Sequence, residues 1–395
     1  MKNGWEIKKL GDVCDTGAGG TPLKAHKDYY IGGTIPWLMS GEVSQGEVFE
    51  AKNFITEKGL KNSSAKLFPI NTVLVAMYGA TAGQVGILKF EACTNQAVCG
   101  ILPNDKTIPE YLFYCFLSKK DELVAQAVGG AQPNISQIKI RNTKIPFPPL
   151  PEQKRIVAIL NEAFTSIAKA KANAEQNLKN AKELFESYVQ GVFENKGDNW
   201  EEKTLGEIAD VEYGYTDKST EEGDYRYIRI TDIDKNGELI LDDKKYIKHS
   251  KEAEGFLIQD NDLLMARTGA TFAKVLLYNG DEPSVFASYL IRIKFKEKIE
   301  NALYWYFTKT KYYWEQANSL QSGAAQPHFN GAAVKQVVFS YPKSTKEQKV
   351  LIEKFETLSV ETKKLEAIYQ SKINDLEELK KSVLQKAFSG ELKQN

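Results

Sequence analysis

The side chains with the richest hydrogen-bonding chemistry fall in two short loops, and each loop occurs twice in the sequence. Arg267 and Thr268 precede a Gly-Ala-Thr segment in "MARTGAT", where the earlier copy reads "VAMYGAT". His328 follows a Gln-Pro pair in "AAQPH", where the earlier copy has Asn134 in "GAQPN". Because an asparagine replaces the histidine, the comparison favours hydrogen bonding within the loop over acid–base catalysis.

Several kinds of catalytic or metal site are excluded by the sequence. "GAGGTP" (17–22) is rich in glycine but lacks the Gly-Lys-Ser/Thr of a phosphate-binding loop. Neither a dinucleotide-binding fingerprint nor the Asn-Pro-Pro-aromatic motif of adenine methyltransferases occurs. The 4 cysteines are widely spaced and the 3 histidines are scattered, so we expect no metal site. The cysteines are expected to be reduced and buried.

Length and composition indicate a cytosolic protein of two or three domains. The chain has 395 residues, 42% of them hydrophobic and 26% charged, with 52 basic and 52 acidic side chains. It contains no run of about 18 apolar residues that would cross a membrane. The N-terminus lacks the apolar core of a signal peptide, so a cytoplasmic location is expected.

An internal repeat organises these motifs. "WEIKKLGDVCD" at 5–15 returns as "WEEKTLGEIAD" at 200–210, and "PEQKRI" at 151–156 returns as "KEQKVL" at 346–351. Both pairs are offset by 195 residues, which is far longer than a solenoid repeat and indicates a duplicated domain. The expected division is into two globular parts, each followed by a long helix: 1–150, 151–195, 196–345 and 346–395.

Both predicted long helices carry an apolar repeat of 3.5 residues, which is typical of a coiled coil. Its interruptions at Asn177 and Lys372 are equivalent under the offset of 195. They are either polar residues that fix the register of the seam or points where the seam slips onto Leu178 and Ile373. The predicted seam residues are Ile156, Leu160, Ile167, Leu184, Leu351, Phe355, Leu365 and Leu379.

The proline-rich stretch "KIPFPPLPEQK" (144–154) precedes the first helix. Prolines disfavour a continuing helix but are tolerated in its first turn, so the stretch suits either a polyproline ligand or a hinge. Its second copy, "FSYPKSTKEQK", also leads into a helix, and Ser344 or Thr345 can cap it. Because a ligand motif would not recur in this position, the sequence favours a hinge.

Short β-rich runs separated by turn residues, together with the helices, indicate the α+β class for both globular parts. Residues 1–150 hold 16 basic and 13 acidic side chains, and residues 196–345 hold 20 and 24. Neither balance is that of a domain that binds many phosphates unaided.

The order of these motifs, present twice, resembles the specificity subunit of type I restriction–modification systems over essentially the whole chain. The resemblance is carried by the Trp-Glu start, the Gly-Gly-Thr-Pro turn (19–22), Gly-Ala-Thr, Gln-Pro, and the Pro-x-x-x-Gln hinge with its long helix. The second copy has "YTDKST" in place of the glycine turn and one proline in its hinge, so its loop shapes stay open.

The resemblance implies two target-recognition domains, each reading one half of a bipartite sequence in double-stranded DNA with an unread spacer. The helices would pair antiparallel, set the spacer and carry two methyltransferase (modification) subunits. Those subunits would methylate adenine N6 with S-adenosylmethionine, and motor-nuclease (restriction) subunits would cleave DNA using ATP and Mg²⁺. The chain itself would be no catalyst, bind no cofactor and contact no membrane.

Chemistry suggests which residues contact DNA, since arginine commonly reads guanine and amides suit adenine. Arg267 is the strongest candidate because it differs between the copies. The same loops could instead be conformational fixtures of both domains. The candidates are Arg267, Thr268, Thr271, Tyr78, Thr81, Gln132, Asn134, Gln326 and His328.

Two other functions stay open on the sequence. The chain could be the recognition subunit of a related system whose methyltransferase and nuclease form one polypeptide. It could also be a scaffold that binds no DNA, with two adaptor domains on a coiled-coil strut.

Overall fold

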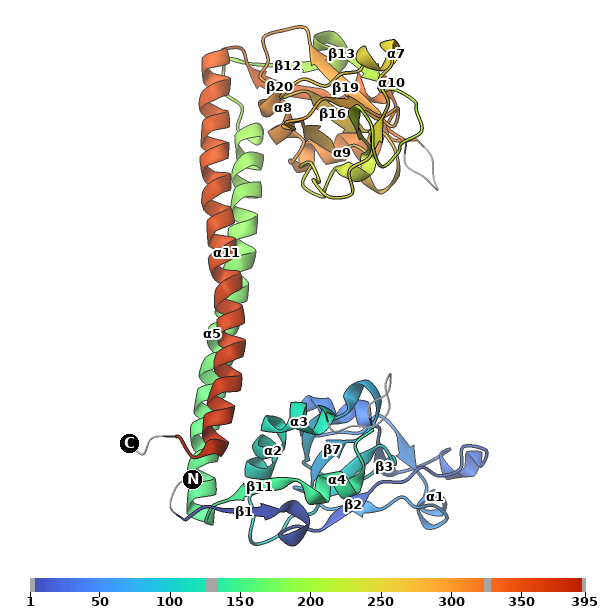
Figure 1. The fold of residues 1–395 in the computed structure, drawn as a ribbon, viewed down its shortest axis with the longest axis vertical. Helices are drawn as coiled ribbons and strands as arrows, with labels where there is room; N and C mark the ends of the chain where they lie inside the picture. The colour runs from blue at the N-terminus through green and yellow to red at the C-terminus, as the bar shows by residue number, and fades with distance from the viewer. Residues whose placement is uncertain (1–3, 126–133, 323–327, 393–395) are drawn as a thin grey trace. The chain divides into compact units, whose positions relative to one another are not determined.

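The computed structural model describes residues 4–125, 134–322 and 328–392, which fall into two compact units. The first unit comprises Met1–Asn173 with Lys372–Asn395, and the second comprises Ala174–Ser371. Each unit contains one globular part and a portion of both long helices, α5 (Leu150–Glu194) and α11 (Thr345–Ser389) (Figure 1).

In its described residues, the globular part of the first unit has two larger sheets and one short sheet. The five-stranded sheet has the spatial order β2 (Thr16–Ala18), β10 (Val98–Ile101), β7 (Val73–Ala76), β8 (Val85–Leu88) and β4 (Glu47–Val48). The four-stranded sheet has the order β5 (Phe54–Ile55), β3 (Ile35–Leu38), β9 (Ala92–Thr94) and β6 (Leu67–Phe68). The short sheet pairs β1 (Glu6–Lys9) with β11 (Lys144–Phe147). Its α-helices before α5 are α1 (Glu57–Lys61), α2 (Pro109–Ser118), α3 (Lys120–Ala125) and α4 (Gln137–Asn142).

The central strands β7, β8 and β10 are buried along their whole length. On one face, Val75 and Ile87 pack in a cluster with Phe116 of α2. On the other face, Leu74 packs in a cluster with Leu38 of the second sheet. Because both faces are covered, these strands are continuous apolar runs rather than alternating ones.

The second unit repeats this plan. In its described part, one sheet has the order β13 (Ala209–Tyr213), β19 (Leu290–Phe295), β16 (Leu263–Ala266) and β17 (Val275–Leu277). Another has the order β15 (Tyr246–Ile247), β14 (Tyr225–Ile228) and β18 (Ser284–Phe286), and β12 (Trp200–Thr204) pairs with β20 (Val338–Pro342). The helices are α6 (Leu205–Ile208), α7 (Lys251–Glu254), α8 (Asn301–Phe307), α9 (Lys311–Leu320) and α10 (Gly331–Val334).

The α+β prediction and the duplication are confirmed by matching strand pairs. β3 and β9 pair in parallel, as do β14 and β18, while β1–β11 and β12–β20 are both antiparallel. All four cysteine side chains are buried and free, as expected. Within the described ranges, no helix combines the length and apolar character needed to cross a lipid bilayer.

The two long helices pair antiparallel within each unit. In the first unit, Ile156 and Leu160 of α5 share a buried cluster with Leu384 and Ala387 of α11. In the second unit, Val189 and Phe193 near the end of α5 share a cluster with Phe355 near the start of α11. Since the start of one helix meets the end of the other, the antiparallel pairing is confirmed in both places.

The structure decides what the polar interruptions of the apolar repeat do. Asn177 and Lys372 are exposed, whereas the neighbouring Leu178 and Ile373 are half-buried. The seam therefore slips by one residue and does not place a polar group between the helices. This is expected because a nearly straight helix has 3.6 residues per turn and drifts relative to a strict 3.5 repeat.

Three of the predicted residues lie outside the seam. Leu184 is 50% exposed, Leu365 is 38% exposed and Leu379 is 48% exposed, so the prediction is wrong for them. On α5 the half-buried Phe185 and the buried Val189 take over beyond Ala181. Of the other predicted seam residues, Leu351 is half-buried. The remaining ones are buried: Ile156, Leu160, Ile167 and Phe355.

The proline-rich stretch turns out to be a junction between a strand and a helix. Residues 144–147 form β11, and α5 begins at Leu150, where the Pro149 carbonyl accepts hydrogen bonds from two backbone N–H groups of the first turn. At the second junction, the Ser344 hydroxyl accepts from the Glu347 N–H at 3.4 Å and caps α11. The capping prediction is thus confirmed for Ser344.

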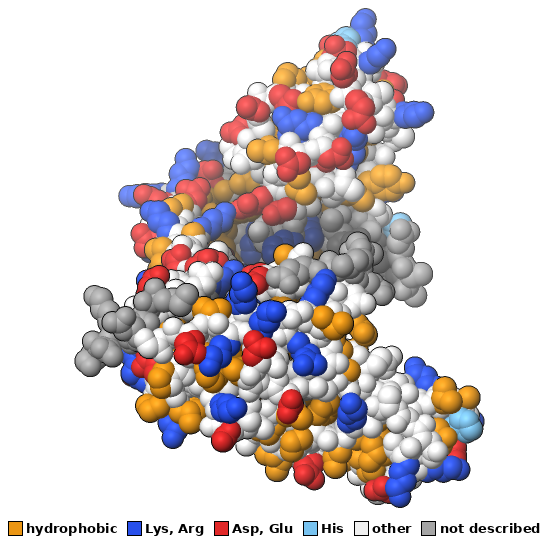
Figure 2. All heavy atoms as spheres, turned by 60° about the horizontal axis from the view of Figure 1, so that its bottom comes forward, with side chains coloured by type: hydrophobic (Ala, Val, Ile, Leu, Met, Phe, Trp, Pro, Cys, Tyr) orange, Lys and Arg blue, Asp and Glu red, His pale blue; other side chains and the backbone are white. Residues whose placement is uncertain are grey.

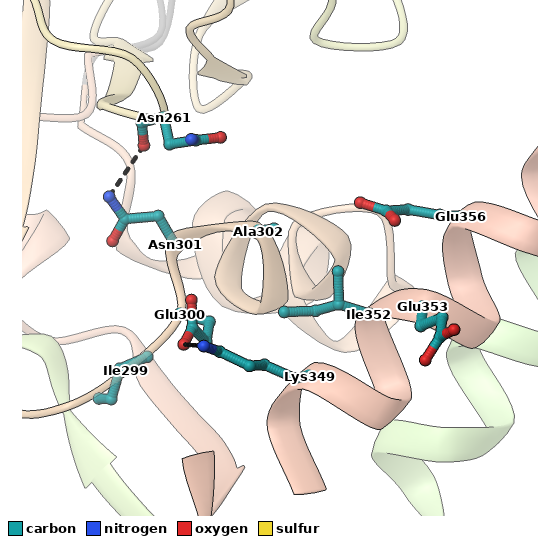
Figure 3. Close-up of a pocket in the computed structure, with 9 residues that line it drawn as sticks. All are labelled: Asn261, Ile299, Glu300, Asn301, Ala302, Lys349, Ile352, Glu353 and Glu356. Carbon is teal, nitrogen blue, oxygen red and sulfur yellow. Dashed lines mark hydrogen bonds and ion pairs between the residues drawn. The ribbon is translucent and has the colours of Figure 1, made fainter. Parts of the chain in front are cut away.

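The start of α11 borders a cleft of about 410 Å³ against the loop that precedes α8 (Figure 3). An ion pair of 3.5 Å joins Lys349 on α11 to Glu300 beside α8. The Asn301 side chain donates to the Asn261 carbonyl at 2.8 Å. The ion pair connects the second globular part to the helix that follows it in sequence, while the hydrogen bond joins two segments within that part.

Candidate DNA interface

The first candidate loop leaves the central strand of each unit in the same way. In the first unit, β7 is followed by Met77, Tyr78 and a 3₁₀ turn over Gly79–Thr81. In the second unit, β16 is followed by Arg267, Thr268 and a 3₁₀ turn over Gly269–Thr271. Gly79 has φ 69° and Gly269 has φ 75°, a left-handed conformation that favours glycine. The shared Gly-Ala-Thr is therefore, in part, a conformational requirement.

The second candidate loop lies directly against the first in both units. The Ile135 N–H donates to the Met77 carbonyl at 2.8 Å, and the Phe329 N–H donates to the Arg267 carbonyl at the same distance. Asn134 forms a β-bridge with Tyr78 in the first unit, and His328 forms one with Thr268 in the second. The structure thus brings together the residues that the sequence placed in separate loops.

The loops differ in which side chains reach the surface. Tyr78 is 39% exposed, and Asn134 and His328 are exposed, so all three are available to a partner. Thr268 is only 6% exposed, and the Thr81 hydroxyl donates to the Tyr78 carbonyl at 3.2 Å within its own turn. Thr271 is half-buried, while Gln132 and Gln326 lie outside the described residues.

Two tyrosines that the sequence reasoning missed complete the second site. The Arg267 guanidinium carbon lies 5.1 Å from the ring centroid of Tyr213 and 5.5 Å from that of Tyr289. Both contacts are within the range of cation–π attraction. An available signal was that Tyr213 stands where the first copy has Ala18. The equivalence of Tyr289 and Ala97 appears only in the structure, where their carbonyls accept from the N–H groups of Arg267 and Met77.

The glycine turn of the first unit is reproduced in the second without its sequence. The N–H groups of Gly19 and Gly20 donate to the carbonyls of Val98 and Thr94, and those of Gly214 and Tyr215 donate to the carbonyls of Leu290 and Phe286. A Cβ at Gly19 or Gly214 would lie 2.1 or 2.2 Å from its nearest atom. The backbone at the first glycine is therefore shared, because Gly214 stands in the place of Gly19. The surroundings of the next residue differ, since an added Cβ at Gly20 would lie 2.3 Å from the Ala65 nitrogen, whereas Tyr215 carries a side chain.

The comparisons with known proteins agree with this geometry. A family model described as "Type I restriction modification DNA specificity domain" matches residues 2–179 and, a second time, residues 197–376. The chain belongs to this family. We call the two matched regions the first and the second specificity domain.

Two relatives with curated names are similar in sequence to this chain. The type I restriction enzyme MjaIX specificity subunit of Methanocaldococcus jannaschii is 31% identical over 53% of this chain, although that alignment spans only 52% of the relative. The MjaVIII specificity subunit of the same organism is 23% identical over 98% of this chain and 93% of its own.

Two solved chains share the fold. The HsdS subunit from Thermoanaerobacter tengcongensis matches with a TM-score of 0.67 at 18% identity, covering 99% of this chain and 98% of that one. A chain from a study of assembly and conformational transition in a type I R-M system matches with a TM-score of 0.79 at 19% identity, over 99% of both chains.

Basic and acidic side chains are interspersed over much of the surface that Figure 2 shows. This agrees with the nearly balanced charges of both specificity domains. Phosphate binding over a long stretch of duplex would need an excess of lysine and arginine. Directional contacts from a few side chains are the chemistry that these domains can supply.

Proposed function

We propose that this chain is the DNA-recognition subunit of a type I restriction–modification complex, in which each specificity domain reads one half of a bipartite target. The observation that carries the proposal is that the paired loops have the same backbone arrangement in both domains but present different side chains. Tyr78 and Asn134 occupy the paired loops of the first domain, and Arg267 and His328 occupy those of the second. Different hydrogen-bonding groups on one scaffold would select different bases.

The chemistry of such a complex would belong to other subunits. Methyltransferase subunits would bind S-adenosylmethionine and methylate adenine N6, and motor-nuclease subunits would use ATP and Mg²⁺. The balanced charge of this chain supports that division, because partners that surround the DNA would supply most phosphate contacts. The chain would act in the cytoplasm, where the chromosome of a bacterial or archaeal cell lies.

The methyltransferase subunits would dock on the helix pair. In the second unit, an apolar groove of about 510 Å³ runs between α5 and α11, with Leu184, Tyr188, Val350 and Leu358 among its lining residues. Leu184 is 50% exposed and Val350 is 42% exposed. An amphipathic helix of a partner would cover these side chains, as helices in a bundle cover one another.

Methylome sequencing of a strain with and without this gene would test the proposal. We expect deletion to remove adenine methylation at a single asymmetric motif of two short blocks separated by a spacer. Restoring the gene on a plasmid should restore methylation at the same motif. A methylome that does not change on deletion in a strain with active methyltransferase subunits would contradict the proposal.

A further inference from the structure

Arg267 contacts two aromatic rings without using its hydrogen-bonding groups. Its guanidinium carbon lies over the rings of Tyr213 and Tyr289, at 5.1 and 5.5 Å from their centroids. Cation–π attraction places the cation over the face of an aromatic ring, and such a contact supplies no oxygen or nitrogen acceptor to the five guanidinium donors.

The other arginines of the second unit differ from Arg267, because each of them forms an ion pair. Arg226 pairs with Glu282, Arg229 with Asp232, and Arg292 with both Glu212 and Asp262. Among the residues that the structure describes, the Arg267 guanidinium forms no ion pair and no hydrogen bond. Its neighbours Tyr213 and Tyr289 are 43% and 54% exposed, and Arg267 itself is half-buried, so the group is partly accessible beside an aromatic patch.

Tyr213 is itself held in place. Its hydroxyl accepts a hydrogen bond of 2.8 Å from the Gly331 N–H, at the start of α10. The backbone of Tyr289 is tied to Arg267, whose N–H donates to the Tyr289 carbonyl at 3.0 Å. The arginine and its two rings therefore come from three adjacent strand ends with fixed register.

The first specificity domain has the same backbone positions and a different set of side chains. The Met77 N–H donates to the Ala97 carbonyl, as the Arg267 N–H donates to the Tyr289 carbonyl. Ala18 is paired with strand β10, as Tyr213 is paired with strand β19. Met77 is 2% exposed and Ala97 is 9% exposed. The scaffold is stable with a methionine and two alanines, so it does not require the arginine and two tyrosines.

The geometry points to a guanine-binding site in the second specificity domain, in which Arg267 donates to O6 and N7 of one guanine. This inference rests on the proposed function and assigns Tyr213 and Tyr289 as positioning residues. A planar fork of donors matches the two acceptors that guanine presents in the major groove. A phosphate contact would not need the rings, and a domain with 20 basic and 24 acidic side chains over 196–345 offers little support for one.

The test uses the full chain reconstituted with its methyltransferase subunits and a duplex library that carries every single base change in the target. For the wild type, we expect one position of the second domain's half-target to require guanine. Arg267→Ala should reduce discrimination at that position by roughly 10- to 100-fold and leave the other half-target unchanged. Tyr289→Leu should reduce it by a smaller factor, and Tyr289→Phe, which keeps the ring, should retain it.

Arg267→Lys separates a base contact from a phosphate contact, because lysine keeps the charge and loses the fork. A guanine reader should lose part of its discrimination in this variant, because lysine can still donate to O6 or N7 but without the rigid fork, whereas a phosphate contact would leave discrimination unchanged. Uniform weakening across all sequences by Arg267→Ala, with normal discrimination in Arg267→Lys, would overturn the inference and leave the proposed function intact. A wild-type complex without preference in either half-target would overturn the proposed function itself. Melting curves of each variant would verify that it is folded.

Discussion

Gln153 and Gln348, which are 195 residues apart, make the same three hydrogen bonds in the two units. The Gln153 carbonyl oxygen accepts from the Ile108 N–H at 3.0 Å, and its amide donates to the carbonyls of Lys106 and Pro148 at 3.2 and 2.9 Å. Gln348 accepts from Glu300 at 2.9 Å and donates to Lys298 and Pro342 at 3.3 and 2.8 Å. Both side chains are fully buried. Each glutamine fastens the start of a long helix to the globular part before it.

Replacing Gln153 by alanine is expected to destabilise the first unit by about 2–4 kcal/mol. The reason is that three hydrogen bonds are lost and buried backbone groups are left without partners. Urea unfolding followed by circular dichroism would measure the change. Gln385→Ala, at an exposed position of α11, is the matched control and should change stability by no more than about 0.5 kcal/mol. A cost for Gln153→Ala as small as the control's would show that the glutamine does not fasten the helix.

The purified chain alone should transfer no methyl groups and should bind DNA weakly and in a salt-dependent way. Its net charge of +0 leaves few phosphate contacts, so we expect a Kd of about 10⁻⁴ to 10⁻⁶ M for any sequence at physiological salt. Fluorescence anisotropy with target and scrambled duplexes would measure this. Addition of the methyltransferase subunits should create sequence-specific methylation. Methyl transfer by the chain without any partner would contradict the division of labour that we propose.

Exchange of one specificity domain should change one half of the target. Replacing residues 199–342 by the matching region of a relative is expected to alter the half read by the second domain and to leave the other half as it was. The reason is that each domain has its own core and its own pair of loops. Methylome sequencing of a strain that carries the hybrid gene would give both halves at once. Changes in both halves would mean that the domains do not read independently.

Gly79→Ala and Gly269→Ala should each cost about 1–2 kcal/mol, because an L-residue is disfavoured at positive φ. Crowding does not contribute at Gly79, where no atom lies within 4 Å of an added Cβ. Gly191 in α5 has equally open surroundings but no positive φ. Gly191→Ala should therefore stabilise the chain by roughly 0.5–1 kcal/mol. Equal effects at Gly79 and Gly191, measured by thermal unfolding, would disprove the conformational role of the first glycine.

The length of the helix pair should set the unread spacer. Insertion of seven residues after Asn173 and seven after Ser371 would lengthen both helices by roughly 10 Å and rotate their apolar faces by only about 20°. Three base pairs span about the same distance, and bending would absorb part of it. We therefore expect the spacer to grow by about one to three base pairs, with both half-targets retained.

Inserting two residues into α5 alone is the control for this experiment. It turns the apolar face away from α11 and should impair assembly with the methyltransferase subunits, which size-exclusion chromatography would reveal. If the double insertion assembles but still methylates only the original spacer, the helices do not measure the distance.

Several features of the fold followed directly from local pattern. The repeat of 195 residues located both domains, and the apolar period located both long helices to within a few residues. The same period misplaced Leu184, Leu365 and Leu379, which are exposed. A strict 3.5 repeat assumes a supercoil, whereas these helices drift by the small mismatch between 3.5 and 3.6 residues per turn. Such a mismatch accumulates over many turns and is not visible in a short window.

The sequence by itself determined that the chain is duplicated, that each half ends in a long helix, and that the paired loops carry different side chains. The tertiary structure alone decided that Arg267 lies over the rings of Tyr213 and Tyr289 and that Gly214 makes the hydrogen bond that Gly19 makes in the first unit. The physical reason is the separation along the chain of the residues that come into contact. Helix periodicity is local, but the arginine and its rings stand 54 and 22 residues apart and meet only through the register of β13, β19 and β16.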